Sequence, residues 1–328
     1  GTAAMDVLTT GACNIALGID ALGAATDNCD NIAIGQSALA ASDGDGDQNI
    51  AIGKSALGGA DVSGGYNVAI GYYSGTAVTT GTYNILIGGL AGDALTTGAE
   101  NVAIGHEALS TENAHGTNVA IGFRSLKVQD AGANAYNTAV GHNTGTAITT
   151  GVQNTLLGGR AGDALTTGSY NIAIGVDALT TEDVYGYNVA IGGYALQDLN
   201  AADNAFNVAI GYQAGTEMTT GKYNTILGSQ AMNTGITTGD FNIAVGYTAG
   251  VAMTSGVRNT LVGSLAGYSL TTGNYNTALG YGALYTEDEH AGNTAIGYQA
   301  LVTQNAGADA YNTAVGHQAG TAVTTGIY

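Results

Sequence analysis

Residues 43–47, which read DGDGD, are the part of the sequence whose residue types and spacing best suit chemistry. Asp residues that alternate with Gly can present several carboxylates to one Ca²⁺ ion, as in the first half of a calcium-binding loop. The pattern breaks at Lys54, which stands where a bidentate Glu would complete such a loop. Two interpretations stay open: a calcium site formed by Asp43, Asp45 and Asp47, or a solvated acidic turn.

The five His residues show no spacing that suits catalysis or a metal site. His106, His142 and His317 each stand five residues after an Asn that recurs through the chain, where other copies carry Tyr, and this indicates a surface position. His115 and His290 have no metal-ligand partner at a useful spacing. No nucleophile–base set and no phosphate-binding loop accompanies them. The sequence therefore predicts that the chain is not an enzyme and, calcium apart, has no cofactor.

The Asp and His residues above lie within a short repeat that extends over the whole chain, so the fold of this repeat determines their positions. The motif Asn-x-Ala-Ile-Gly and its variants occur eighteen times, and successive Asn residues lie 17, 18 or 19 positions apart. The residue after each Asn is Ile, Val or Thr, and the third residue after it is Leu, Ile or Val. The residue between these two is Ala in fourteen copies. This pattern is typical of a strand that is buried on both faces.

A unit of this length has room for two short strands and two turns but not for a helix. Every copy has Gly four residues after the Asn, which fits a sharp corner. The sequence therefore predicts an all-β fold, a parallel β-solenoid of about eighteen coils of about 17 residues. We expect one continuous array over residues 1–328, a segment of a longer fibre, about 85 Å long at the spacing of stacked strands.

The recurrent Asn is expected to be structural. Its side-chain amide can hydrogen-bond to the neighbouring coil, which predicts a ladder along the array. Tyr or Phe precedes the Asn in more than half of the coils, and this predicts a partial aromatic stack. The ladder includes Asn67, Asn84, Asn101, Asn137 and Asn171.

Two kinds of coil alternate in pairs. Eight residues after the Asn, a Gly-type coil carries Gly, as at Gly75 and Gly92, and a Leu-type coil carries Leu, as at Leu109 and Leu126. The connections after Leu-type coils hold 16 of the 25 Asp and Glu residues. We expect these acids to form a solvated anionic stripe that limits lateral aggregation. Bridging between fibres by divalent cations is the alternative.

Cys13 and Cys29 are the two cysteines of the chain, and they lie one and two residues before the recurrent Asn in adjacent coils. Stacked coils bring such positions within the Cα distance that a disulfide needs. The sequence leaves open a disulfide between them or two unpaired, small apolar side chains.

Composition excludes several classes of protein. Lys and Arg number 6 against 25 Asp and Glu, so the formal net charge is −19, and the chain lacks the basic surface that nucleic acid or an anionic membrane requires. Only 9% of residues are charged and 45% are apolar, the reverse of the disordered signature. No window of about twenty apolar residues predicts a bilayer span. We expect no nucleic-acid partner and no membrane insertion.

The motif Asn-x-Ala-Ile-Gly-x-x-Ala resembles the head repeats of trimeric autotransporter adhesins, whose short units coil into a left-handed parallel β-roll that packs as a trimer. The longer form at residues 311–320, followed by Thr324-Thr325-Gly326, is similar to repeats in tail-fibre-like proteins of phages and bacteria. The resemblance covers essentially the whole chain, although adhesin head units are shorter than 17 residues. It implies a fibre that is extracellular, on a cell surface or on a virion.

The expected function is that of a structural fibre or filament, a stiff extracellular or virion-surface shaft. One alternative is an adhesin that contacts glycans or surfaces through exposed Tyr, His and Thr side chains. A more remote alternative is an ice-binding solenoid. The Thr pairs at coil ends are replaced in half of the coils, so they form no continuous array of the kind that ice binding uses.

The sequence also predicts self-association into a homotrimer, with head-to-tail filaments as a further option. We expect the aliphatic positions of each strand, such as Ile70, to point into the coil, and the residue between them to point outward. That outward stripe is apolar in all eighteen coils, which is not expected on a soluble monomer. Its predicted interface residues are Ala69, Ala103, Ala173, Leu86 and Leu156.

Overall fold

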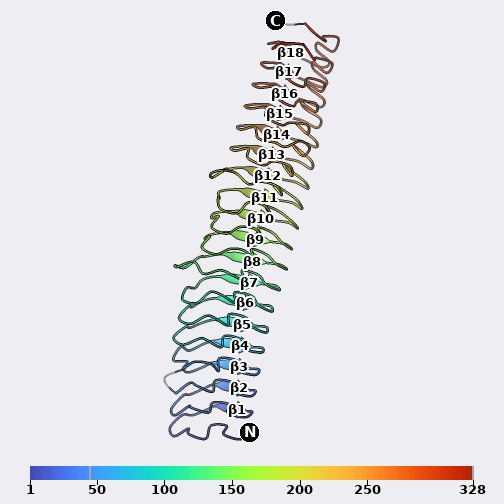
Figure 1. Ribbon diagram of the computed structural model, residues 1–328. Helices are drawn as coiled ribbons and strands as arrows, with labels where there is room; N and C mark the ends of the chain where they lie inside the picture. Colours follow the sequence, from blue (N-terminus) through green and yellow to red (C-terminus); the bar gives the residue numbers. More distant parts are fainter. Residues whose placement is uncertain (44–45, 327–328) are drawn as a thin grey trace. The chain divides into compact units, whose positions relative to one another are not determined.

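The structure, a computed structural model, describes residues 1–43 and 46–326 and divides the chain into two compact units, Gly1–Gly168 and Ser169–Tyr328. Each unit consists of short strands joined by turns (Figure 1), and its described residues form no helix. The strands of the first unit are β1 (Ile15–Leu17), β2 (Ile32–Ile34), β3 (Ile50–Ile52), β4 (Val68–Ile70), β5 (Ile85–Ile87), β6 (Val102–Ile104), β7 (Val119–Ile121), β8 (Thr138–Val140) and β9 (Thr155–Leu157). Those of the second unit are β10 (Ile172–Ile174), β11 (Val189–Ile191), β12 (Val208–Ile210), β13 (Thr225–Leu227), β14 (Ile243–Val245), β15 (Thr260–Val262), β16 (Thr277–Leu279), β17 (Thr294–Ile296) and β18 (Thr313–Val315).

Within each unit, successive strands pair in parallel and in the same register. Ala69 of β4 lies opposite Leu86 of β5, and Leu86 lies opposite Ala103 of β6. Each motif therefore stacks on its counterpart in the next coil, as the period of the sequence requires. The predicted all-β parallel β-solenoid of about 17-residue coils is confirmed. The continuity of the array over residues 1–328 stays a prediction.

The rest of each coil is a succession of turns, so the predicted second strand does not form. Glu107 and Leu109 have φ angles of 55° and 50°, in the left-handed region that non-glycine residues seldom adopt. Hydrogen bonds to the next coil offset this cost: the Leu109 N–H donates to the Ser125 carbonyl at 3.0 Å. Repeated bends are needed because a coil this short must close on itself.

The Gly that follows each strand is required by close approach of the backbone. Gly105 has a φ of 138°, and a Cβ at this position would lie 2.3 Å from the carbonyl oxygen of Gly122 in the next coil. Any side chain here would clash with backbone that cannot move independently. The invariant Gly of the motif therefore sets the spacing between coils.

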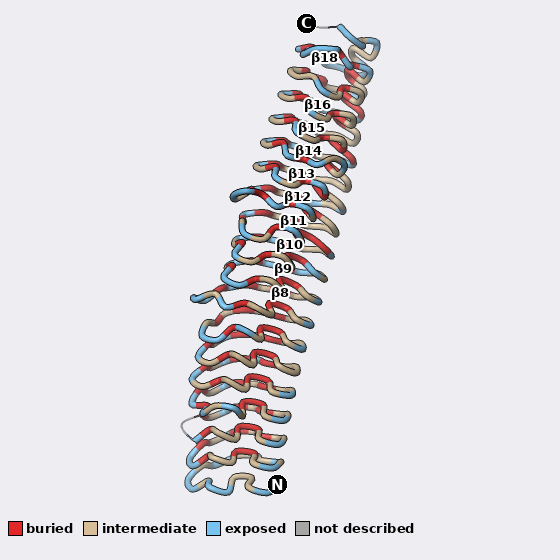
Figure 2. The backbone as a smooth tube through the Cα atoms, in the orientation of Figure 1, coloured by how far each residue is buried: buried red, intermediate tan, exposed pale blue. Residues whose placement is uncertain are grey.

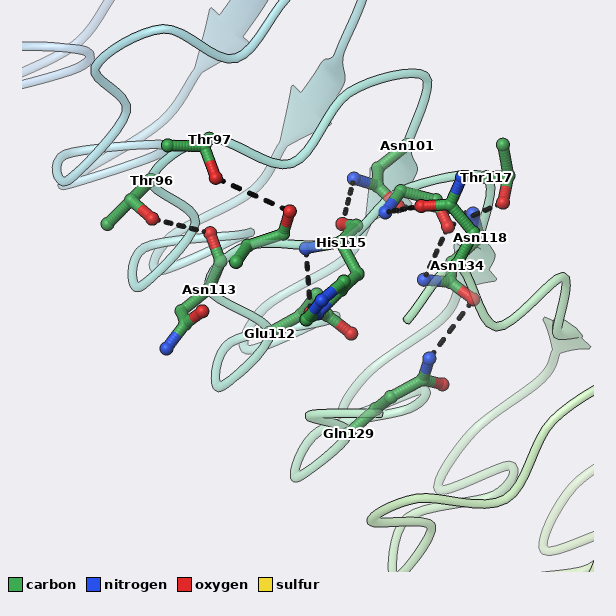
Figure 3. Close-up of polar contacts among 12 residues, drawn as sticks. Thr96, Thr97, Asn101, Glu112, Asn113, His115, Thr117, Asn118, Gln129 and Asn134 are labelled. Carbon is green, nitrogen blue, oxygen red and sulfur yellow. Dashed lines mark hydrogen bonds and ion pairs between the residues drawn. The ribbon is translucent and has the colours of Figure 1, made fainter. Parts of the chain in front are cut away.

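The predicted Asn ladder is present. The Asn101 N–H donates to Oδ1 of Asn84 at 3.0 Å, and the Asn118 N–H donates to Oδ1 of Asn101 at 3.1 Å. The Asn101 Nδ2 donates to the His115 carbonyl at 3.1 Å, so the same side chain also ties down a turn (Figure 3). Because these amides are buried and paired, they stabilise the stacking of coils. Equivalent bonds involve Asn67, Asn137 and Asn171.

The core of each unit lies inside the coils, where buried residues recur at the same place (Figure 2). Leu86 fills the space that two Gly residues leave. A Cβ on Gly75 would lie 2.6 Å from its Cδ1, and a Cβ on Gly92 would lie 2.8 Å from its Cδ2. Leu156 occupies the same relation to Gly145 and Gly162. The larger strand residues therefore compensate for Gly in the turns, as native packing density demands.

Candidate interaction surface

The two faces of each strand are the reverse of the sequence prediction. In β4, Ala69 is fully buried inside the coil, whereas Val68 and Ile70 are only half-buried and lie on the outer face. The same order holds in β6, where Ala103 is buried between Val102 and Ile104. The prediction that Ile70 and its counterparts point inward was wrong.

The reason is the width of the coil interior. In Leu-type coils the turn opposite the strand supplies the large interior side chain, such as Leu109, and the strand supplies Ala. Where a Gly-type coil also has Ala in its strand, as at Ala69, Leu86 of the next coil fills the space. The predicted interface residues have no exposed surface and cannot meet another chain. These residues are Ala69, Ala103, Ala173, Leu86 and Leu156.

The outer face of the second unit carries a column of stacked aromatic rings at the position before each Asn. All five residues are 42–48% exposed, although the inner rings of the stack have a neighbouring ring on both faces. Ring centroids of successive members are 4.9, 5.0, 5.5 and 4.9 Å apart. The members, in order, are Tyr170, Tyr187, Phe206, Tyr223 and Phe241.

Arg258 extends this column by one coil. Its guanidinium carbon lies 5.4 Å from the ring centroid of Phe241 and 5.7 Å from that of Tyr275. The Arg258 Nη1 also donates a hydrogen bond to the Tyr275 hydroxyl at 3.0 Å. A cation between two ring faces is attracted by both, so the column continues through a charged member. We call the residues from Tyr170 to Tyr275 at this position the aromatic column.

The first unit has shorter stacks on the same face. Tyr66 and Tyr83 stack with centroids 4.9 Å apart. Five residues after the Asn, Phe123 stacks between His106 and His142 at 5.7 and 5.2 Å. The predicted partial aromatic stack and the outer position of these His residues are both confirmed.

Between these aromatic positions, the outward side chains of the strands form two apolar rows, which we call the outer apolar face. Its members are the first and third residue of each strand, and in all eighteen copies they are Ile, Val, Leu or Thr. None of them carries a charge. A sheet face of this composition suits contact with another apolar surface or with the flat faces of ring-shaped ligands.

Two of the three predicted calcium ligands, Asp43 and Asp47, can be described, because Asp45 lies outside the described residues. Asp43 is exposed, and its backbone N–H donates to Oδ1 of Asp61 at 3.1 Å. Asp47 instead caps the preceding coil, where its Oδ1 accepts from the Cys29 N–H at 2.6 Å. The Asp47 carboxylate is thus engaged in a hydrogen bond, whereas Asp43 contributes its backbone N–H, and calcium stays a prediction.

Cys13 and Cys29 are free thiols, so the predicted disulfide is not formed. Cys29 Sγ accepts a hydrogen bond from the Ala12 N–H at 3.4 Å. Cys13 lies in the left-handed region with a φ of 60°, and its side chain is exposed. The offset of one residue between the two coils places the thiols in different surroundings.

The predicted solvated acidic stripe is wrong for three of its members. Glu112, Glu182 and Glu287 are fully buried. Each lies eleven residues after its Asn, the position that Gly-type coils fill with an apolar residue such as Leu95. Comparing this column of positions across coils would have revealed them, because the acids replace core residues. Burial raises the pKa of Glu182, although N–H donors from Tyr185 and Ala201 act in the opposite direction.

Glu107, which lies outside the coil interior, forms ion pairs with two basic side chains. Glu107 Oε2 lies 2.7 Å from Lys127 Nζ and 2.7 Å from Arg124 Nε. Hydrogen bonds from Lys127, and then from Arg124, lower the pKa of Glu107 to about 2. This triad joins two neighbouring Leu-type coils on the surface and is separate from the apolar face.

Within residues 1–43 and 46–326, no helix has the length and apolarity that crossing a membrane requires. A scan against protein-family models and searches of curated proteins and of solved structures found no match to the chain.

Proposed function

We propose that the chain is a structural fibre protein, a shaft of stacked β-coils displayed outside the cell or on a virion. The observation that carries the proposal is the outer apolar face, which repeats without a charged member from coil to coil. Neighbouring coils are tied by both backbone and buried Asn hydrogen bonds. Such an array resists bending at any single coil, which is the mechanical property a shaft needs.

In this proposal, the outer apolar face packs against the same face of other copies, and the assembly is a homotrimer. Identical chains have identical coil spacing, so rows on one copy match those on another over many coils. The two rows carry no charge although the chain has a net charge of −19, and 16 of the 25 acidic residues lie in the connections after Leu-type coils. Copies can therefore approach through the sheet while their charged turns stay in water.

Electron microscopy of the purified chain tests the fibre. We expect rods of uniform width, wider than a single solenoid. Val102→Glu and Ile104→Glu place carboxylates on the outer apolar face and should give thinner particles, because both positions accept a solvated side chain. Thr97→Glu, on an exposed turn, is the matched control and should leave the width unchanged. Compact particles without elongation would contradict the proposal.

A binding role is the second candidate, and the aromatic column favours it. Five stacked, exposed rings at a regular spacing present a continuous row of ring edges, with three Tyr hydroxyls among them, that a glycan could contact. A glycan array probed with the chain tests this role. Tyr223→Ala with Phe241→Ala should abolish a glycan signal, whereas Tyr66→Ala, in a two-ring stack, should not. If the chain binds no glycan on the glycan array, the binding role is contradicted and the structural fibre is the one proposed function that stands.

A further inference from the structure

Three buried glutamates occupy equivalent positions in three Leu-type coils. Glu112 lies in the coil that starts at Asn101, and Glu182 and Glu287 lie at the same position in later coils. All three side chains are fully buried in a place that other coils fill with apolar residues. A carboxylate in such a place needs compensation from its neighbours.

Glu112 is not fully compensated by the protein. Its Oε1 accepts from the backbone N–H of His115 at 3.1 Å, as Figure 3 shows. Its Oε2 is buried and has no hydrogen-bond partner. The Nδ1 of His115 lies 3.4 Å from Glu112 Oε1 and also has no hydrogen-bond partner. One buried oxygen of the Glu112 carboxylate and the His115 nitrogen beside that carboxylate are thus both without a hydrogen-bond partner.

A third ligand atom comes from the neighbouring coil. Asp130 is exposed, and one of its carboxylate oxygens lies within 4.8 Å of ligand atoms of Glu112 and His115. Metal–ligand distances near 2.0–2.2 Å place the ligands of one ion about 3–4 Å apart. Binding of an ion would draw the half-buried His115 and exposed Asp130 side chains toward the buried Glu112 to reach that spacing.

The same constellation recurs in the second unit. Glu287, Asp288 and His290 bring three ligand atoms within 4.8 Å of one another. His290 Nδ1 and Glu287 Oε1 are hydrogen-bonded at 3.0 Å, unlike their counterparts in the first unit, and Glu287 Oε2 is buried without a partner. Both clusters combine a buried Glu with a His three residues later, and they differ only in the source of the third ligand. This repetition argues against a chance cluster.

Glu182, the third glutamate, differs from the other two in the residue that accompanies it and in the hydrogen bonds of its carboxylate. Tyr185 stands where the other two coils have His. Glu182 Oε1 accepts from the Tyr185 N–H at 3.1 Å, and its Oε2 accepts from the Ala201 N–H at 3.4 Å. Where the imidazole is missing, the second carboxylate oxygen is satisfied by the backbone. The unpaired oxygen and the His therefore occur together.

We propose that Glu112, His115 and Asp130 bind one divalent transition-metal ion, and that Glu287, Asp288 and His290 bind a second. One imidazole and two carboxylates suit Zn²⁺, with water completing its coordination, better than Ca²⁺ or Mg²⁺, which take oxygen ligands only. The ion would neutralise a buried carboxylate and join a turn to the coil interior. Asp130 would also tie one coil to the next.

Titration calorimetry with ZnCl₂ on the full chain tests the proposal. Cys13→Ser and Cys29→Ser form the background, because free thiols also bind zinc. We expect two ions per chain. His115→Tyr should remove one ion and its combination with His290→Tyr should remove both, while circular dichroism stays unchanged, since the Glu182 coil accommodates Tyr. Zn²⁺ should raise the thermal midpoint of the background chain but not that of the double variant.

Two controls isolate the sites. Glu182→Gln and His106→Tyr should leave the stoichiometry at two, because neither residue belongs to a proposed site. A background chain that binds fewer than one ion, or a double variant that still binds two, would overturn the proposal. Equal affinity for Ca²⁺ would overturn the assignment to transition metals.

Discussion

The Gly-type coil at residues 84–100 and the Leu-type coil at residues 101–117 share a strand, a ladder Asn and a backbone path, yet fill their interiors in opposite ways. In the first, the strand contributes the large side chain, Leu86, and the turn contributes Gly92. In the second, the strand contributes Ala103 and the turn contributes Leu109. The difference teaches that either side of a coil can supply the large interior side chain. Where both are small, as at Ala69 and Gly75, Leu86 of the next coil fills the space.

The two coils also differ at the far end of the interior. Leu95 closes the Gly-type coil, whereas Glu112 stands at the same position in the Leu-type coil. The apolar side chain adds to the core, and the carboxylate requires hydrogen bonds from the following turn. At this position the Gly-type coil therefore adds to the apolar core, and the Leu-type coil of this pair holds a polar site.

The largest expected effect comes from placing the Leu-type residue in the Gly-type coil. Leu95→Glu buries a carboxylate beside Gly98, in a turn without the His that accompanies Glu112. We expect a loss of about 4 kcal/mol in the free energy of unfolding at neutral pH. Denaturant unfolding measures it. Thr97→Glu, two residues away and exposed, should cost less than about 1 kcal/mol, and equal losses in both variants would contradict the comparison.

The second largest effect is expected from moving the large interior side chain from the strand to the turn. Leu86→Ala leaves a cavity beside Gly75 and Gly92 and should cost about 3 kcal/mol of unfolding free energy. Adding Gly92→Leu should restore part of the loss, because Gly92 has a φ of 55° and Leu109 occupies the equivalent position at 50°. Unfolding midpoints of the single and double variants test this compensation. A double variant less stable than Leu86→Ala would show that the two sides are not interchangeable.

A smaller effect concerns the pH dependence of a buried acid. Burial raises the pKa of Glu182 above its usual value. The folded chain therefore holds the proton more tightly than the unfolded chain, and this group's contribution to stability is lost as pH rises through its folded pKa. Glu182→Gln should flatten that decline and stabilise the chain at neutral pH. Thermal midpoints across the acid range measure it, and an unchanged slope would contradict the raised pKa.

The smallest effect comes from the surface triad of the Leu-type coils. Glu107→Gln removes the partner of Arg124 and Lys127 and should cost about 0.5 kcal/mol, since these side chains are partly solvated. Because the pKa of Glu107 is about 2, the contribution is fully present above the ordinary Glu pKa of 4.5 and is lost as pH falls through about 2. High salt should shrink the difference. A loss of unfolding free energy that does not change with salt would indicate that Glu107 stabilises the chain through side-chain packing and not through its charge.

Period and residue type were enough to predict the strands, their register and the Asn ladder, because eighteen copies of Asn67 and its surroundings leave one way to stack. The inner and outer faces were not predictable from alternation alone, since Ala69 and Ile70 are both apolar. Size was the missing signal: in every Leu-type coil, the strand residue opposite the turn Leu, such as Leu109, is Ala. Glu112 was missed because an acidic turn ordinarily faces water.

The central claim is that the outer apolar face joins copies of the chain, and the native mass tests it most directly. Mass photometry of the unsubstituted chain should show a species at three times the chain mass of 32.4 kDa. Replacing Ile70, Ile104 and Ile121 by Glu, one on each of three coils, should shift the mass to that of one chain without loss of β-structure. A single-chain mass for the unsubstituted protein, or an unchanged mass in the triple variant, would contradict the account.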